Sequence, residues 1–551
     1  MTRFKTITLY VALAVVTVVA IFGISGLERS IERDIKDYHL RFTGEIKNAP
    51  GWISFTTVAL GSFRGLLADV LWLHQMSLKD QGSYYEMVQL ANWITDLQPQ
   101  VAGSAVYLGW EMAYNLSVTC ANYEDRWRWI AKGTALLRDK AMLYNPEDVS
   151  IYLDLARIYG EKFGNVFDDA HLYYKNKLYL EASRAMGFKP NQKPDWEAMA
   201  KVVPDFLLTD WDTSKGFNER FPEKSPARGI ISSAGYSDFA ALLSAYQKAD
   251  GLPVGKLDSL SQPDREWLNS YLRAAWIWQS FRLNPHLVVK INQDYGDLDW
   301  RTPEALAIYW AVLGQGYRPP NQTRRQFDNR IHIALQETFR NGRPLLTDPE
   351  NKKYFIGVPN FSVLDRTLQA AEEGYKNNMD DETFTNSRIY FLRDAVLLLY
   401  SYGQTKRAGE MFDLLKKYDP GQDKNETLKH YYDRALQEKI NFATVKSIGE
   451  LLVGTIYCEL HYLVYGDNVR AKELANFAEK IYAKFIEDNT ERKSGADLPP
   501  LDVLIGAVVD NYLKSAPPEL ANRLRRIIEQ QAAAKQQAER ESSAASRNPA
   551  K

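Results

Sequence analysis

The chain has 551 residues, a formal net charge of −1 and a charged fraction of 25%. This length exceeds what one hydrophobic core usually organises, so we expect two or more subregions. The balance of 68 Lys and Arg against 69 Asp and Glu leaves no basic excess, and no basic stripe, zinc-finger spacing or recognition-helix signature indicates nucleic-acid binding.

Residues 1–26 are predicted to form a membrane anchor. Arg3 and Lys5 precede an uncharged, apolar run from Thr6 to Ile24. At a helical rise of about 1.5 Å per residue, this run nearly spans the hydrocarbon core of a bilayer. The main alternative is a cleaved secretory signal, whose apolar region is usually shorter and ends at a small-x-small site such as Gly23-Ile24-Ser25. We favour an uncleaved anchor with a cytoplasmic N-terminus, because cations are retained on the cytoplasmic side.

Residues 27–50 are rich in charge and are predicted to form a helical stalk. A second apolar stretch, from Trp52 to Leu73, is long enough to suggest a membrane span. Arg64 and Asp69 lie inside it, and each costs at least about 2.5 kcal/mol at mid-bilayer. We therefore expect a buried helix in which these two charged residues find polar partners.

Residues 51–188 are predicted to form paired helices. Apolar residues at the 3.6-residue period of one helix face begin at Tyr84 and end before Pro99. The helices expected after Pro99 cover residues 101–118, residues 124–143 and a segment from about residue 149. Short helix pairs that end at a proline are typical of an α-solenoid, so the predicted fold class is all-α.

The last of these helices carries Tyr152-x-x-Leu155-Ala156-x-x-Tyr159. This motif resembles the first-helix pattern of a tetratricopeptide repeat (TPR), Trp-x-x-Leu-Gly-x-x-Tyr, whose small residue lets two helices approach closely. Trp110-x-x-Ala113-Tyr114 begins the same pattern but lacks the small residue. The spacing between the helix pairs is irregular, so we describe them as TPR-like.

Residues 382–515 are predicted to form further TPR-like helix pairs. Ala408-x-x-x-Phe412 followed by Pro420 matches the spacing of the second helix of the repeat, with Leu415 where the repeat usually has alanine. Another pair, over about residues 456–478, has the small residues but lacks the aromatic residue and the closing proline.

Three longer segments of the sequence also resemble a particular group of proteins. The strings at residues 64–73, 110–115 and 299–304 resemble those of uncharacterised, membrane-anchored bacterial TPR-like proteins. The resemblance runs from about Ser62 to Trp310. It implies a scaffold located in the cell envelope, and it supplies no catalytic residues.

Residues 189–381 are rich in proline, glycine and aspartate, and we predict a helical, loop-rich insert there. One expected helix is led in by Ser261, and another is capped by Thr302 with Pro303 in its first turn. No sustained two-residue alternation indicates a large sheet. Residues 516–551 are predicted to be a helix that frays into a disordered tail.

No pattern in the chain indicates a metal site, a cofactor or a nucleophile. The seven histidines are scattered, and His-Glu-x-x-His, Cys-x-x-Cys, a phosphate-binding loop and a Gly-x-Ser-x-Gly elbow do not occur. We therefore predict no catalytic residues, no metal and no cofactor. Cys120 and Cys458 are expected to be core thiols, with a disulfide between them left open.

One acidic segment carries the alternative of enzymatic activity. Asp297 and Asp299, with Glu304 nearby and Trp300 as a sugar platform, suggest an all-α hydrolase acting on envelope glycan, provided that the carboxyl groups lie about 5–9.5 Å apart in a cleft. An Asp-x-Asp before a helix cap is more often a turn that hydrogen-bonds its own backbone. We favour the turn.

The leading interpretation is a non-enzymatic, membrane-anchored scaffold that mediates protein–protein interactions in a bacterial envelope assembly, such as one for transport, secretion or polysaccharide handling. The expected partners are other envelope or membrane proteins, with membrane contact through residues 6–24 and no nucleic acid. We expect a single-pass protein of the bacterial inner membrane whose soluble part is periplasmic. The candidate partner-binding groove is formed by Tyr107, Tyr114, Tyr152 and Tyr159, with core positions as the alternative for most of them.

Overall fold

The computed structural model describes residues 63–164, 168–189, 193–205, 211–253, 255–318, 324–346, 355–377, 382–441, 445–490 and 498–546. The predicted anchor at 1–26 and stalk at 27–50 lie outside these residues. Among the described helices, none combines the length and the apolar character that a bilayer span requires.

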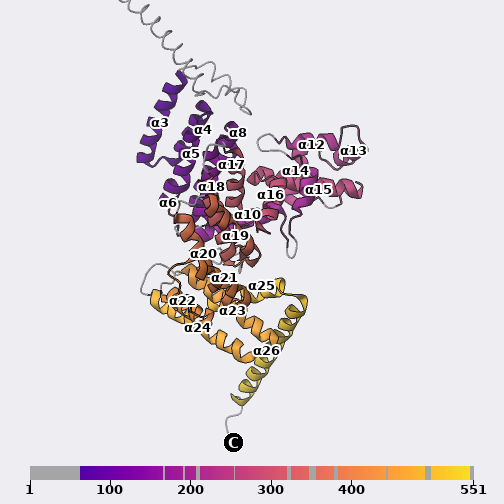
Figure 1. Cartoon of the computed structure of the whole chain (residues 1–551). Coiled ribbons are helices and arrows are strands. Elements are labelled where there is room, and N and C mark those ends of the chain that lie inside the picture. The colour runs from indigo at the N-terminus through magenta and orange to yellow at the C-terminus, as the bar shows by residue number, and fades with distance from the viewer. Residues whose placement is uncertain are drawn as a thin grey trace, which may run out of the picture. The chain divides into compact units, whose positions relative to one another are not determined.

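The described chain is almost entirely helical, which confirms the all-α prediction (Figure 1). It divides into two compact units. The first comprises the described residues up to Val101 together with Leu143–Asn145, and the second comprises Ala102–Met142 and the residues from Pro146 onward. The division at Val101 falls inside the stretch predicted as repeats.

The first unit is built on two packed helices, α3 (Phe63–Gln81) and α4 (Tyr84–Leu97). On α4, the buried residues Met87, Leu90, Ala91 and Ile94 recur every three or four positions, as the apolar period of this segment indicates. Asn145 is bonded to the rest of this unit, because its Nδ2 donates a hydrogen bond of 2.6 Å to the carbonyl oxygen of Pro99.

The prediction of a buried helix near residues 52–73 is wrong for its described part. On α3, Ala68, Gln75 and Leu78 are buried, but most of its large apolar side chains are exposed, and so is Asp69. The charged residues within this apolar run argued against a bilayer span, but they did not show that the fold covers the apolar side chains.

The second unit begins with a run of helices that includes three π-helical segments, named η1 to η3. From Ala102 to Met186 the helices are α5 (Ala102–Trp110), η1 (Glu111–Leu116), α6 (Ser117–Thr119), α7 (Tyr123–Ala135), η2 (Leu136–Ala141), α8 (Met142–Tyr144), α9 (Val149–Arg157), η3 (Ile158–Phe163) and α10 (His171–Met186). The last two residues of α8 belong to the first unit. Side-chain caps fix two of the starts: Asn122 accepts a hydrogen bond from the Asp125 N–H at 2.7 Å, and Asp148 accepts one from the Ser150 N–H at 3.0 Å.

The central part of the second unit contains helices and the only two strands of the described residues. Its elements are α11 (Trp196–Val202), α12 (Thr213–Arg220), α13 (Pro226–Ser233), α14 (Phe239–Ala249), α15 (Gln262–Phe281), α16 (Pro285–Tyr295), α17 (Pro303–Tyr317), α18 (Arg325–Asn341), β1 (Arg343–Leu346), β2 (Phe355–Val358), the 3-10 helix η4 (Phe361–Val363) and α19 (Leu364–Asn377). The strands pair antiparallel, with Arg343 opposite Val358. The predicted caps are confirmed, since Ser261 caps α15 and Thr302 caps α17.

The C-terminal part of the second unit is helical throughout its described residues. Its helices are α20 (Glu382–Ser401), α21 (Thr405–Tyr418), α22 (Leu428–Asn441), α23 (Val445–Tyr465), α24 (Asn468–Thr490), α25 (Leu501–Ser515) and α26 (Pro518–Ser546). A cluster of buried side chains around α23 joins α24, α25 and α26 and is separate from the larger cluster that begins at Ala102.

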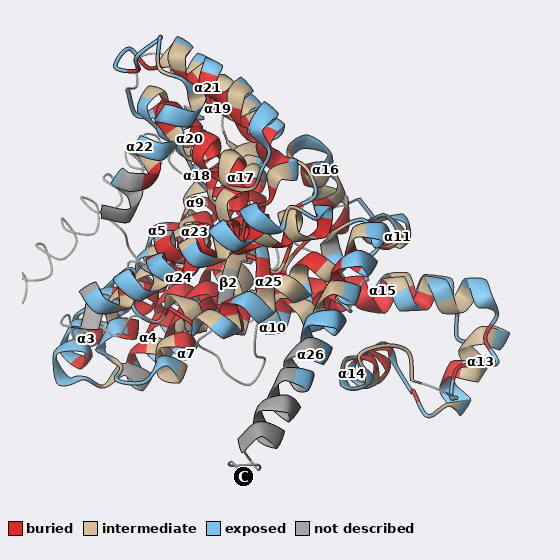
Figure 2. Ribbon diagram, turned by 90° about the horizontal axis from the view of Figure 1, so that it is seen from below, coloured by how far each residue is buried: buried red, intermediate tan, exposed pale blue. Residues whose placement is uncertain are grey.

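Helix α17 is the most completely buried element of the larger cluster (Figure 2). It packs against α9 on one side and α18 on another, and its turns from Pro303 to Ala311 are buried on every face. Gly314 permits this packing, because a Cβ atom at that position would lie 2.5 Å from Tyr152 Cβ and 2.7 Å from Phe327 Cε1.

Replacing Gly314 with alanine should therefore destabilise the second unit. A Gly314→Ala side chain forces α9 and α18 away from α17, and overpacking of this kind costs about 1–3 kcal/mol. We expect a lower urea midpoint when unfolding is followed by tryptophan fluorescence. Gly316→Ala is the matched control, because nothing lies within 4 Å of a Cβ there. That change should be neutral or stabilise by up to about 1 kcal/mol; equal destabilisation by both variants would contradict the packing argument.

The pH dependence of stability offers a second prediction, through Glu459 on α23. Burial, and then the negative charge of Glu479, raises the pKa of the Glu459 carboxyl to about 7. Between the unfolded pKa near 4.5 and this value the native state holds the extra proton, so the contribution of Glu459 to stability falls as pH rises through that window.

A Glu459→Gln variant should therefore be more stable than the parent at pH 8, by about 1–2 kcal/mol after allowance for partial exposure, and nearly unchanged at pH 4.5. Urea unfolding at the two pH values measures this difference. Glu473→Gln, at an exposed position of α24, serves as the control and should change stability at neither pH. A gain for Glu459→Gln that is the same at both pH values would refute the assignment.

Candidate partner-binding groove

Three aromatic side chains form a row along the helix made by α5 and η1. Tyr107, Trp110 and Tyr114 occupy positions i, i+3 and i+7, so they lie on one side of this helix. The ring centroids of Tyr107 and Trp110 are 6.5 Å apart, and those of Trp110 and Tyr114 are 5.8 Å apart with the rings nearly parallel. Tyr107 is 46% exposed, and the other two are half-buried. We call these three residues the aromatic row.

The opposite side of the same helix explains why the aromatic row faces outward. Ala105, Leu108, Met112 and Ala113 are all buried in the larger hydrophobic cluster or beside it. Burial of that apolar side fixes the rotation of the helix and leaves the aromatic row at the boundary with solvent. The change to π-helix at Glu111 widens the turns between Trp110 and Tyr114, a local departure that is frequent at functional sites.

Helix α9 supplies the second wall of a groove. Asp154 and Arg157 of α9 and Gly103, Val106, Tyr107 and Trp110 of α5 line a groove of about 340 Å³. Asp154 and Arg157 form an ion pair with one another, three positions apart on the helix. The guanidinium of Arg157 also lies 5.9 Å from the ring centroid of Tyr114.

Asp154 has an acceptor that the fold does not use. The residue is only 8% exposed, and its Oδ2 accepts no hydrogen bond from the described residues. Burial raises the pKa of the Asp154 carboxyl, while the positive charges of Arg157 and Arg330 oppose this shift. A buried oxygen without a donor carries a free-energy cost, which a partner in the groove can relieve. Oδ2 itself is closed to solvent, so a partner's donor reaches it only when the Asp154 carboxyl turns toward the groove.

Two cations, Arg157 and Lys162, lie near the ring of Tyr114 at the end of the aromatic row. Lys162 of η3 lies 5.5 Å from the Tyr114 ring centroid, and it pairs with Asp168 at 2.5 Å. The Tyr114 hydroxyl donates a weak hydrogen bond of 3.5 Å to the carbonyl oxygen of Arg157. Burial, and then the negative charge of Glu161, raises the pKa of the Tyr114 hydroxyl above its usual value, so this group stays protonated. Tyr114 is thus fixed, while Tyr107 is the accessible end of the row.

The tyrosines predicted for the groove divide into two pairs. Tyr107 and Tyr114 belong to the aromatic row, whereas Tyr152 and Tyr159 are buried. The ring of Tyr152 stacks on Tyr317 with centroids 5.3 Å apart, and that of Tyr159 stacks on Phe163 at 5.2 Å. Both buried tyrosines are therefore core residues and cannot contact a partner at this surface.

Sequence reasoning did not assign Trp110, Asp154 and Arg157 to the groove. Trp110 carried a signal, because it begins a TPR-like motif, but that motif marks packing positions. Asp154 and Arg157 are the polar residues that lie between the motif positions of α9. Their spacing of three positions, which allows an ion pair on one side of the helix, was the signal that could have indicated them.

The acidic segment that suggested a hydrolase does not form a pair of available carboxylates. Asp297 is exposed and forms an ion pair with Lys193. Asp299 accepts hydrogen bonds from Arg301 Nε at 2.8 Å and Nη2 at 2.6 Å, so its charge is compensated. Asp299 also accepts hydrogen bonds from the Arg301 N–H and, through its carbonyl oxygen, from Thr302. The segment is therefore the backbone-bonded turn that we favoured.

The other two residues of that hypothesis are inside the protein. Trp300 is almost fully buried, and its Nε1 donates a hydrogen bond of 3.1 Å to Asn292 Oδ1, so its ring offers no platform to a sugar. Glu304 is buried in the first turn of α17. The four residues do not share an accessible surface.

The cysteines and the metal-ligating side chains support no further site in the described residues. Cys120 and Cys458 are free thiols, and burial raises the pKa of Cys458 to about 12. Within the described ranges, no three His, Cys, Asp or Glu side chains are placed to hold a metal ion.

A larger concavity of about 1040 Å³ is lined mainly by residues of α12, α13 and α14. Several of its polar side chains bond within the fold itself. Arg228 lies 4.6 Å from the Phe217 ring centroid and donates a hydrogen bond to Asn218, and Asp238 caps α14 by accepting one from the Ala241 N–H. The groove beside the aromatic row is the better candidate, because Asp154 there has an unused acceptor.

Searches of protein-family models, of curated proteins and of solved structures found no match to this chain. The likeness to TPR-like proteins therefore depends on the motifs quoted above, and the function has to be argued from the groove.

Proposed function

We propose that this protein is a non-enzymatic, membrane-anchored scaffold that binds another protein in the groove between α5 and α9. The observation that carries the proposal is the aromatic row beside the unused acceptor of Asp154. Aromatic rings supply large, rigid contact area, and a buried acceptor supplies specificity, because only a partner with a correctly placed donor satisfies it. Tyr, Trp and Arg are also the residue types that dominate binding energy at protein interfaces.

The groove suits a segment of polypeptide better than a small metabolite. Its volume lies at the low end for small-molecule sites, which are usually about 300–1,000 Å³, and Tyr107 leaves it open to solvent. An extended segment can place one side chain against the rings and donate a backbone or side-chain N–H to Asp154. Lysine, arginine and backbone amides are the donors that a carboxylate oxygen prefers.

TPR-like stacking of helix pairs is the architecture that we propose for the second unit. Helices α20 and α21 pack together, as do α23 and α24. Ala408 and Phe412, the motif residues of α21, are both buried, as expected where two helices of a repeat meet. A stack of such pairs presents the outward positions of its helices to a partner.

The membrane anchor, the bacterial inner membrane and the periplasmic location of the soluble part are further elements of the proposal. The anchor and its orientation are inferred from the charge and length of residues 1–26. The bacterial envelope, and with it the periplasm, is what the resemblance to membrane-anchored TPR-like proteins implies. An anchored groove concentrates its partner at one membrane face, which suits an envelope assembly for transport, secretion or polysaccharide handling. The partners would be other envelope or membrane proteins.

Photocrosslinking in cells tests the groove directly. A benzophenone amino acid replaces Tyr107 in the full-length protein, and the captured proteins are identified by mass spectrometry. A Trp110→Ala substitution in the same chain should weaken binding of the specific partner by about 5- to 150-fold and reduce its capture accordingly, because loss of an aromatic anchor costs about 1–3 kcal/mol. Tyr390→Ala, which removes an exposed aromatic residue on α20, should leave capture unchanged. Capture that is insensitive to Trp110→Ala would contradict the proposal, provided that circular dichroism shows both variants folded.

The hydrolase alternative is tested with an Asp297→Asn variant. Asp297 is the accessible carboxylate of the acidic segment, so the substitution should not affect folding. We expect no release of soluble glycan fragments from purified cell-wall glycan by either the parent or the variant. Fragment release by the parent that disappears in Asp297→Asn would favour the hydrolase instead.

A further inference from the structure

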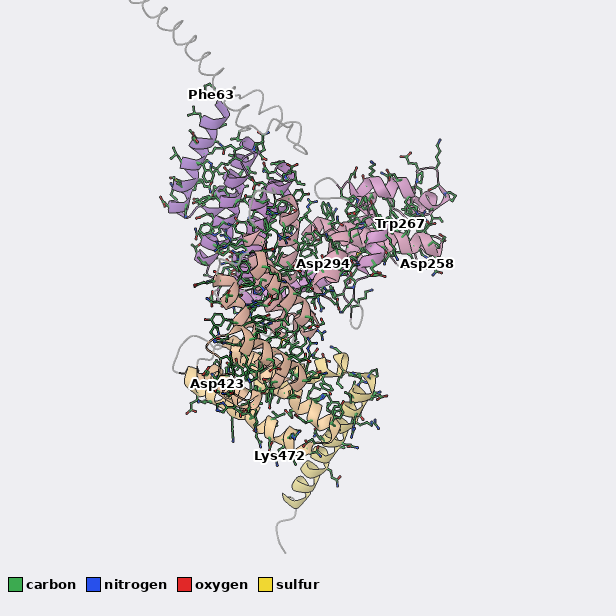
Figure 3. The ribbon with its side chains drawn as sticks, viewed as in Figure 1. Phe63, Asp258, Trp267, Asp294, Asp423 and Lys472 are labelled. Atoms are coloured by element: carbon green, nitrogen blue, oxygen red, sulfur yellow. The ribbon has the colours of Figure 1, made fainter. Side chains whose placement is uncertain are left out.

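The helix α3 presents a row of exposed apolar side chains, which we call the α3 stripe. Figure 3 marks its first residue, Phe63, at the start of the helix. The members of the stripe are between 41% and 73% exposed, and they are Phe63, Leu66, Leu67, Val70, Leu73 and Met76.

The spacing of these residues places them on one side of the helix. They recur at intervals of three or four positions, and successive residues of an α-helix are rotated by about 100°. The buried residues Ala68, Gln75 and Leu78 lie on the other side, which packs on α4. Helix α3 thus uses a small face to pack within the first unit and leaves its large apolar face outward.

The charge of α3 shows which kind of surface fits the stripe. The helix carries two cations, Arg64 and Lys79, and two carboxylates, Asp69 and Asp80, so its charges balance. Asp69 is exposed on the same side of the helix as the stripe, and the two cations lie near opposite ends of the helix, so they form no cluster. The charges of α3 therefore do not indicate a partner that is attracted electrostatically. The exposed apolar side chains indicate a surface that offers apolar contact.

The sequence that leads into α3 identifies that occupant. Residues 52–63 contain no charged residue, so the stripe continues an apolar stretch of chain. Only 38 residues separate Phe63 from Ile24, the end of the predicted anchor. If helical, those residues would span about 57 Å. The stripe is therefore tethered within reach of the bilayer.

We propose that the α3 stripe lies in the interface of the bilayer, where lipid acyl chains cover its apolar side chains. This inference rests on the anchoring proposed above and adds a second membrane contact to it. A helix that lies in the plane of the interface and a helix that spans the bilayer fix the first unit at two points. A single tether at the N-terminus would leave that unit free to rotate.

Fluorescence quenching by lipids tests this contact in the full-length protein. The protein is reconstituted as one copy per nanodisc in phosphatidylcholine, with a genetically encoded fluorescent amino acid at Val70 of the stripe. Gln89, an exposed position of α4, is the control site, and Val15 reports on the anchor. Phosphatidylcholine brominated in its acyl chains quenches only a label that reaches the hydrocarbon.

We expect quenching at Val70 at least twofold stronger than at Gln89, and unchanged when salt is raised or anionic lipid is added. If the label at Val15 is quenched but the label at Val70 is quenched no more than the Gln89 control, the inference is overturned and the anchor stands. Absence of quenching at all three sites would overturn both proposals. Because each disc holds one copy, a contact between two copies cannot produce the expected signal, and dependence on anionic lipid would also refute the apolar contact.

Discussion

The packing of α17 between α9 and α18 is the constraint on which the second unit depends. A helix buried on every face has no amphipathic period of its own, so its neighbours determine its position. Gly314 lets α9 and α18 reach its backbone, and Tyr309 fixes its other side by accepting a hydrogen bond from the Asn284 N–H and donating one to the Arg282 carbonyl. The position of α9, and with it one wall of the groove, therefore follows from contacts on the far side of α9.

Helix α9 divides its residues between packing and recognition. Tyr152, Leu155 and Ala156 are buried. Asp154, which is also buried, and Arg157 line the groove. Because Tyr152 stacks on Tyr317 and α9 packs closely on Gly314, packing fixes the position of α9 and of the pair that lines the groove. Rigid placement of this kind lowers the entropy cost of binding, since less freedom is lost when a partner arrives.

The sequence predicted the helical class and several helix starts, because caps such as Thr302 and Ser261 act locally. It also favoured a turn at Asp299, which the bonds to Arg301 and Thr302 confirm. It did not predict the exposure of α3, since hydropathy measures what a side chain prefers and not whether the fold covers it. Of the four tyrosines proposed for the groove, Tyr107 and Tyr114 belong to the aromatic row beside it. The packing of α5 against α9, which brings Asp154 to the groove, is a long-range contact and has no local signal in the sequence. The π-helical segments likewise lack a sequence pattern.

The groove and the α3 stripe differ in a way that separates their occupants. Both expose apolar area, which water penalises by about 25 cal/mol per Å², so both are surfaces that gain free energy when covered. The groove mixes rings with a carboxylate and a guanidinium, and polar groups of this kind are satisfied only by a partner with matched donors and acceptors. The stripe has no such groups among its six members, so any apolar medium satisfies it equally. A protein can therefore be selected at the groove, whereas the stripe can only discriminate apolar from polar surroundings, and this is what contact with lipid requires.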